Sequence, residues 1–255
     1  MTQTHPAHIP TGFARTGLVV QRAGPVPTRF QVLGERSSGT NFVKRLLGRN
    51  SALRPTEALG WKHGSPSAIA IPADLAVICV VRNAADWALS MHAKPWHATP
   101  ELQALPFSQF LRAEWRSVID RPGYFPGAAD PGVLGRPLQA DRDPVTGAAY
   151  DTLFALRRGK LAGLLSHLNR ECTCALVRLE AVQADPEALL DALLDGLGQP
   201  PRGAAFRPVY KRLGARFRPA VAARPATPQT FSREDRAFMA RELDSAQEAA
   251  LGYVY

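Results

Sequence analysis

The chain has 255 residues, 45% of them apolar, which suits one α/β domain with a substantial core and argues against disorder. The formal net charge of +9 favours an anionic partner such as nucleic acid, acidic lipid or a phosphate-rich cofactor, although a general preference for arginine would give the same excess. Three cysteines are too few for a disulfide framework, and no apolar run approaches the ~18 residues of a membrane span. Because the N-terminus also lacks a leader pattern, we expect a protein of the reducing cytoplasm.

The first half of the chain alternates strand and helix patterns. Polar, aperiodic residues predict a flexible tail over residues 1–15, followed by a single domain over residues 16–255. The patterns after the tail predict strands over residues 17–21, 29–33 and 75–81, and helices over residues 41–47 and 83–94. The run over residues 75–81 is continuously apolar, which is typical of a strand buried on both faces of a parallel sheet. Asn83 is expected to cap the helix that follows, with Asp86 as its capping-box partner.

The second half continues the alternation after a long loop rich in Pro, Gly and Asp. In chain order the patterns predict this loop over residues 119–148, a helix over 150–168, a strand over 175–179, a helix over 186–197, irregular chain over 200–230 and a final helix over 233–251. The whole series predicts an α/β fold with a mostly parallel central sheet flanked by helices. Ligands of such sheets bind at the carboxyl ends of the strands.

A glycine-bounded loop follows the strand over residues 29–33. Gly34 and Gly39 have the G-x-x-x-x-G spacing of a phosphate-binding loop, and the helix that begins behind them adds its N-terminal dipole. Ser37, Ser38 and Thr40 add hydroxyl groups. The nucleotide-hydrolase signature requires Lys and then Ser or Thr after the second glycine, whereas this chain has Thr40 and Asn41. The loop is therefore expected to hold a phosphate without activating a γ-phosphate, although an ordinary strand-to-helix turn has the same composition.

A second anion site is indicated at the end of the strand over residues 75–81. Arg82 closes this strand, and Ser90 follows eight residues later, about two helical turns along. An arginine and a hydroxyl in this arrangement can grip a second phosphate. Each residue alone would be an unremarkable surface side chain.

Taken together, these motifs resemble the PAPS-dependent sulfotransferase family, where PAPS is 3′-phosphoadenosine 5′-phosphosulfate. Residues 37–42 (SSGTNF) resemble its 5′-phosphosulfate loop, and residues 82–90 (RNAADWALS) resemble its 3′-phosphate motif. Residues 61–64 (WKHG) are similar to its K-x-H segment, and residues 179–186 (LEAVQADP) and 251–253 (LGY) are similar to two later family segments. The resemblance implies a P-loop NTPase-like sulfotransferase fold.

The resemblance also implies roles for individual residues. His63 would be the general base, and Lys62 and Arg36 would meet charge on the reacting groups. The cofactor PAPS would be held by a set of nine residues: Arg36, Ser37, Ser38, Gly39, Thr40, Asn41, Phe42, Arg82 and Ser90. The chain departs from the family where Ser37 replaces the loop lysine, where Lys62 and His63 are adjacent, and where Leu179 replaces a tyrosine.

Several alternatives stay open at this stage. His63 has a suitable ordinary pKa for a base, and the alternative for it is a capping or core histidine, whereas Phe42 would either stack on adenine or pack under the sheet. His92 and His97 are weaker substrate-contact candidates. The chain would be a sulfotransferase acting on a small-molecule or carbohydrate acceptor, a non-catalytic PAP-binding or PAPS-binding module, or a P-loop nucleotide kinase. No aromatic-interleaved basic stripe indicates nucleic acid, and no cluster has metal-ligand spacing, so we expect neither nucleic acid nor metal.

Overall fold

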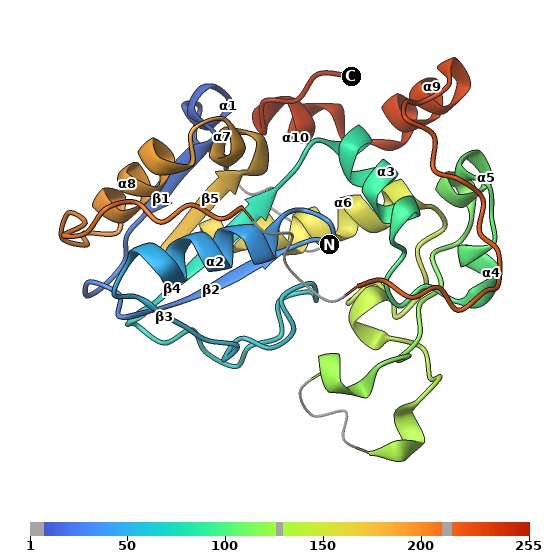
Figure 1. The fold of residues 1–255 in the computed structure, drawn as a ribbon, viewed down its shortest axis with the longest axis horizontal. Coiled ribbons are helices and arrows are strands. Elements are labelled where there is room, and N and C mark those ends of the chain that lie inside the picture. Colours follow the sequence, from blue (N-terminus) through green and yellow to red (C-terminus); the bar gives the residue numbers. More distant parts are fainter. Residues whose placement is uncertain (1–7, 126–129, 211–215) are drawn as a thin grey trace.

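The structure is a computed structural model that describes residues 8–125, 130–210 and 216–255. At its centre is a five-stranded sheet in the order β1-β5-β4-β2-β3 (Figure 1). The strands are β1 (Leu18–Gln21), β2 (Arg29–Gly34), β3 (Arg54–Pro55), β4 (Leu75–Val81) and β5 (Cys174–Arg178). β1 pairs antiparallel with β5, and the other pairings are parallel. The expected α/β fold with a mostly parallel sheet is confirmed.

Helices lie on both faces of the sheet and beyond the carboxyl ends of its strands (Figure 1). Their bounds are α1 (Phe13–Thr16), α2 (Thr40–Asn50), α3 (Ala84–Ala93), α4 (Pro100–Gln103), α5 (Phe107–Arg112), α6 (Leu153–Leu165), α7 (Leu179–Ala184), α8 (Pro186–Gly196), α9 (Arg233–Glu242) and α10 (Ser245–Ala250). Short 3-10 turns are η1 (Pro122–Tyr124), η2 (Pro131–Val133), η3 (Gln139–Asp141) and η4 (Ser166–Asn169).

The core is built on both faces of β4. Every residue of this strand is buried, because α2 and α8 cover one face of the sheet and α6 covers the other. Such two-sided burial explains the continuous apolar run, since a strand with one wet face would alternate apolar and polar residues. A separate apolar cluster joins α3, α5, the start of α6 and α9 beyond the strand ends, and its largest buried side chains include Trp87, Phe110, Trp115 and Phe154.

Some predicted boundaries were wrong. The final helix is interrupted at Leu243, whose backbone is extended, and Asp244 caps the separate helix α10 through the Gln247 N–H. β5 ends at Arg178, so that Leu179 belongs to α7 instead of the strand. The sequence patterns also missed α4, α5 and the short strand β3.

The N-terminal region and the start of α3 differ in detail from expectation. Residues 1–7 of the expected tail lie outside the described residues, whereas Phe13 begins α1 and is fully buried in the core. Asn83 caps α3 as expected, accepting hydrogen bonds from the N–H groups of Ala85 and Asp86. The Asn83 N–H, however, donates to Glu180 Oε1 at 2.8 Å, so the capping-box partner is a distant residue instead of Asp86.

Two absences concern the described part of the chain. Within it, none of the helices combines the length and the apolar character needed to cross a membrane. Among the same residues, no group of three His, Cys, Asp or Glu side chains is placed to hold a metal ion.

Candidate functional site

The loop over residues 34–41 connects β2 to α2 through a tight, self-bonded turn. Ser38 is fully buried and donates from Oγ to the Glu35 carbonyl oxygen at 2.7 Å. Ser37 and Gly39 both have left-handed backbones, with φ values of 64° and 90°. α2 then begins at Thr40, and the first N–H groups of a helix have no partner within it. The loop and this helix end together form a frame of the kind that accepts an anion.

Gly39 is required by both space and backbone conformation. A Cβ at this position would lie 2.4 Å from Leu179 Cδ1, which packs against the loop from the start of α7. Its positive φ would also strain any other residue. Leu179 thus acts as an apolar support of the loop.

Arg82 and Ser90 contact each other directly in the structure. Arg82 Nη1 donates to Ser90 Oγ at 2.9 Å and to the Ser37 carbonyl oxygen at 2.9 Å. Arg82 comes from the end of β4, Ser90 from the second turn of α3 and Ser37 from the phosphate loop. The two predicted anion-binding elements are therefore in direct contact.

Lys62 and His63 also reach the loop, from a turn between β3 and β4. His63 Nδ1 lies 2.6 Å from the Gly34 carbonyl oxygen, and because a carbonyl only accepts, Nδ1 carries the proton and Nε2 keeps its lone pair. Burial, reinforced by the charge of Lys62, lowers the pKa of His63 well below its ordinary value, so the ring is neutral at pH 7. Lys62 Nζ donates to Asn41 Oδ1 at 2.6 Å, and burial lowers the pKa of Lys62. The pair thus contacts the first and last residues of the loop.

Arg36 has a different environment from the one predicted. Its buried guanidinium forms an ion pair with Asp141 at 2.7 Å and lies 5.1 and 5.6 Å from the ring centroids of Trp115 and Trp61. Lys160 Nζ completes this buried cluster, at 3.1 Å from Asp141 Oδ1. Burial opposes ionisation of Asp141, but Arg36 and Lys160 hold its pKa well below the usual range. The charge of Arg36 is therefore neutralised by a carboxylate.

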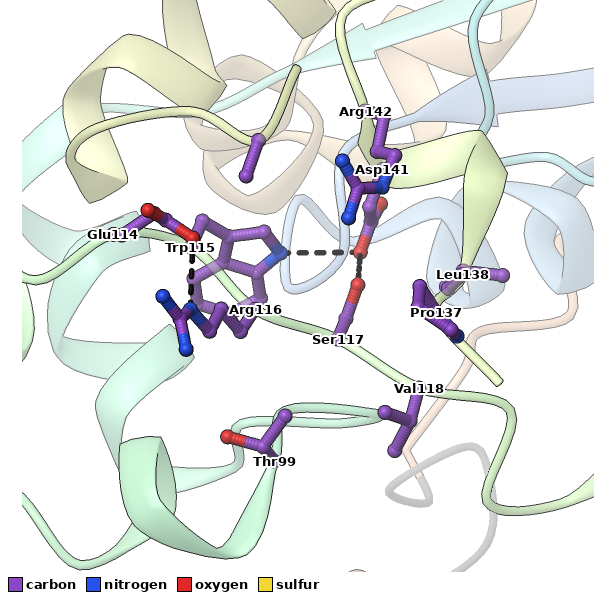
Figure 2. A pocket seen from close by; sticks show the side chains of 11 residues that line it. Thr99, Glu114, Trp115, Arg116, Ser117, Val118, Pro137, Leu138, Asp141 and Arg142 are labelled. Atoms are coloured by element: carbon purple, nitrogen blue, oxygen red, sulfur yellow. Dashed lines mark hydrogen bonds and ion pairs between the residues drawn. The ribbon is translucent and has the colours of Figure 1, made fainter. Parts of the chain in front are cut away.

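Asp141 also lines a cavity of about 320 Å³ (Figure 2). Asp141 accepts hydrogen bonds there from Trp115 Nε1 at 3.1 Å and Ser117 Oγ at 2.7 Å. On the other side of the cluster, Lys160 Nζ donates to the His63 carbonyl oxygen at 3.0 Å. The cluster thus links the wall of this cavity to the backbone of His63.

The remaining candidates divide between site and core. Thr40 is buried, and Phe42 is half-buried against the apolar layer under the sheet, which matches its packing interpretation. His92 bonds Thr227 and the Leu105 carbonyl and packs between phenylalanines, so it is a core histidine. His97 bonds Asp120 Oδ1 at 2.5 Å, and its ring centroid is 6.0 Å from that of Trp61, which itself packs on His63.

A buried charged network behind the loop was not predicted. Arg157, fully buried in α6, donates to Glu35 Oε2 at 2.9 Å, to Glu248 at 2.7 and 3.0 Å, and to the Arg82 carbonyl oxygen at 2.9 Å. Burial raises the pKa of Glu35 to about 7, against the opposing charge of Arg157. The network connects the phosphate loop, the strand end at Arg82 and the C-terminal helix α10.

A scan against models of protein families, a search of curated proteins and a search of solved structures each found no match to this chain.

Proposed function

We propose that this chain is a sulfotransferase that moves a sulfuryl group from PAPS to a hydroxyl or amine acceptor. The observation that carries the proposal is the contact of Arg82 with both Ser90 and Ser37. It joins a phosphate-binding loop to a second cation-and-hydroxyl pair at the carboxyl ends of neighbouring parallel strands. Two adjacent phosphate sites suit a nucleotide that carries phosphate at both its 5′ and 3′ positions.

In this proposal the loop over residues 34–41 binds the 5′-phosphosulfate, and Arg82 with Ser90 binds the 3′-phosphate. Lys62 stands at the Asn41 end of the loop, where it would neutralise charge growing on the leaving phosphate. His63 is fixed with Nδ1 protonated, so Nε2 is free to accept a proton. Transfer forms the bond from acceptor oxygen or nitrogen to sulfur and breaks the bond from sulfur to the bridging oxygen. The acceptor proton passes to His63 Nε2, and PAP leaves.

Arg36 has no direct part in this mechanism, because its guanidinium is bound to Asp141. We instead propose that Arg36 and Lys160 support the site from behind. Lys160 bonds the His63 carbonyl, and both cations lie within 6 Å of the Trp61 ring, at 5.6 and 5.8 Å from its centroid. The acceptor in this scheme is a small molecule or a carbohydrate.

A non-catalytic PAP-binding module is the second candidate, and the environment of Arg36 favours it. Ser37 stands where the family has a lysine, and the neighbouring cation is neutralised by Asp141. In this scheme Lys62 is therefore the cation assigned to neutralise charge on the leaving phosphate, since Arg36 does not contribute. A binding module would retain the Arg82 and Ser90 pair and show no transfer.

Ligand-dependent thermal stability tests the nucleotide assignment. A ligand at ~100 times its Kd adds about 2.7 kcal/mol, which for a domain of this size raises Tm by about 5–11 °C. We expect this rise in Tm with PAP, and a smaller rise than with PAP when the ligand is AMP or ATP with magnesium. An equal or larger shift with ATP would favour the nucleotide kinase, and no shift with PAP would reject the proposal.

Arg82→Ala tests the second phosphate site directly. Loss of charge-assisted hydrogen bonds worth about 1.5–3 kcal/mol should weaken PAP binding by about 10–100-fold and leave AMP binding almost unchanged. Arg22→Ala is the matched control, since this exposed arginine follows β1, whose last residue Gln21 pairs with Cys174 at the start of β5, and so lies at the amino ends of the parallel strands. Equal losses for PAP and AMP in Arg82→Ala would refute the 3′-phosphate assignment. Labelled PAPS with a panel of phenols, sugars and amines then separates an enzyme from a binding module.

A further inference from the structure

Two tyrosines that follow α10 are bonded to the chain segment next to Arg82. Tyr253 Oη donates to Glu180 Oε2 at 2.9 Å, and Glu180 Oε1 accepts the Asn83 N–H at 2.8 Å. One carboxylate therefore connects Tyr253 to the residue after Arg82. α10 and the chain end beyond it lie beside the connection from β4 to α3 (Figure 1).

Tyr255 reaches the next residue and also the buried charged network. Its hydroxyl accepts the Ala84 N–H at 2.7 Å and donates to Glu248 Oε2 at 3.2 Å. Glu248 in turn holds Arg157, whose Nη2 donates to the Arg82 carbonyl oxygen at 2.9 Å. One hydroxyl thus acts on the Arg82–Ala84 segment both directly and through Arg157.

Three consecutive polar groups of the main chain are consequently hydrogen-bonded to side chains of other parts of the fold. They are the Arg82 carbonyl, the Asn83 N–H and the Ala84 N–H, and their partners are Arg157, Glu180 and Tyr255. These groups fix the exit of the chain from β4, which is where the Arg82 side chain originates. A displacement of this backbone would move the guanidinium away from Ser90 and from the Ser37 carbonyl.

The two tyrosines are chemically suited to this task. Burial raises the pKa of the Tyr253 phenol, and partial burial beside Glu248 raises the pKa of Tyr255, which is 40% exposed, so both remain protonated at neutral pH and donate to carboxylates. Tyr253 is buried, and the ring of Tyr255 stacks on it with centroids 6.4 Å apart. The rings therefore provide packing, and the hydroxyls provide the connection to the Arg82 segment.

We propose that Tyr253 and Tyr255 are positioning residues that set the geometry of Arg82 and thereby the selectivity of the site for a nucleotide with a second phosphate. This inference rests on the proposed role of Arg82 in binding a 3′-phosphate. The distance between the tyrosines and Arg82 in the sequence is more than 170 residues, since Tyr253 and Arg82 differ by 171 positions. In this proposal the selectivity of the site is controlled by residues outside its two phosphate motifs, and one of them, Tyr253, ends the LGY segment of the sequence.

Phenylalanine substitutions separate the hydroxyls from the packing. The double variant Tyr253→Phe with Tyr255→Phe keeps both rings and removes both connections. The hydroxyls make three hydrogen bonds of about 1 kcal/mol each, and if the equivalent of one or two of them is lost from binding, PAP affinity falls by about 5–30-fold. AMP affinity should stay within about two-fold, because AMP does not use Arg82 in this scheme. Tyr210→Phe is the control, since the Tyr210 side chain is 87% exposed.

Amide hydrogen exchange of the ligand-free protein gives a second measurement that does not depend on the nucleotide. The double variant should show faster exchange at Asn83 and Ala84 than the wild type, with exchange in β4 unchanged. Isothermal titration with PAP and AMP provides the affinities for the same proteins.

The outcomes are distinguishable. A wild type that does not prefer PAP to AMP refutes the proposed function, whatever the variants do. Unchanged exchange at Asn83 and Ala84 in the double variant overturns the positioning role, whatever the ligand affinities are. Equal losses of PAP and AMP affinity with a lower Tm would show a purely structural role and would overturn it as well. Selective loss of PAP affinity together with faster exchange supports the inference.

Discussion

Glu35 should make the stability of this fold depend on pH, and Glu35→Gln should remove that dependence. The carboxyl group is 5% exposed, and one of its oxygens, Oε2, is bound by Arg157, whereas the other has no hydrogen-bond partner among the described residues. Burial, assisted by the nearby charge of Glu248, raises its pKa from 4.5 to about 7 despite the attraction of Arg157. The folded protein therefore binds this proton more tightly than the unfolded chain does.

The sign and size of the effect follow from this difference in pKa. The contribution of Glu35 to stability is complete below about pH 4.5, decreases as the pH rises and is lost once the pH passes about 7. The two pKa values differ by about 2.5 (7 − 4.5), and at about 1.36 kcal/mol for each unit of pH the contribution is on the order of 3 kcal/mol. For a domain of this length that corresponds to about 6–12 °C in Tm.

The assay compares Tm of the wild type and Glu35→Gln across about pH 4 to pH 8. The measured quantity is the difference between the two proteins, because burial also lowers the pKa values of His63, His92 and His167, whose contributions are lost as the pH falls and oppose that of Glu35. Wild-type Tm minus variant Tm should fall by about 6–12 °C over this range. Parallel profiles for the wild type and Glu35→Gln would refute the reasoning.

Three further variants test other parts of the site. His63→Gln should slow sulfuryl transfer by about 10²–10⁴-fold with PAP affinity unchanged, and wild-type turnover in the variant would mean that another residue is the base. Because burial lowers the pKa of His63, protonation of His63 should not reduce the wild-type rate between about pH 8 and pH 6. Gly39→Ala should lower Tm and weaken PAP binding, since the new Cβ would lie 2.4 Å from Leu179 Cδ1. Adding Leu179→Ala should restore only part of the Tm and of the PAP affinity, because the positive φ of residue 39 persists, and full restoration would contradict the backbone argument. Arg157→Met should lower Tm by about 6–20 °C, because removing the partner of a buried carboxylate such as Glu248 costs about 3–5 kcal/mol. A change in Tm below 2 °C, on the order of 1 kcal/mol, would mean that water solvates the charges of the network well.

The sequence predicted the elements whose burial is uniform and failed where a tertiary contact decides. β4 has the predicted bounds, because two-sided burial produces an unbroken apolar run. The predicted helix over residues 233–251 is divided instead, although its apolar spacing continues across the break at Leu243. Asp244 was the local signal for a new N-terminus, since it caps α10, but an acidic residue is also ordinary on a helix surface.

The local motifs of the site were recognisable, and its long-range contacts were not. The eight-residue spacing of Arg82 and Ser90 predicted that both belong to one phosphate site, and the two side chains lie within hydrogen-bond distance because two turns of a helix fix where the serine lies. Glu35, Arg157 and Glu248 belong to three elements, and each reads as a surface charge in its own segment. The predicted role of Arg36 in binding PAPS did not anticipate its ion pair for the same reason, since its position beside the loop gave no indication of its bond to Asp141.

Lys62 and His63 are adjacent, whereas the sulfotransferase segment that the sequence resembles has the spacing K-x-H, and the structure accounts for the adjacency. The Gly64 N–H donates to the Trp61 carbonyl oxygen at 2.9 Å, which places Lys62 and His63 at the two central positions of a turn. The Gly34 N–H donates to the Lys62 carbonyl oxygen at 3.0 Å and fixes this turn against the end of β2. From the turn the Lys62 side chain reaches Asn41 at the end of the loop, and the His63 ring reaches Gly34 at its start. A strand would need an intervening residue to send both side chains to the same side, whereas a turn does not, so the changed spacing is compatible with both proposed roles.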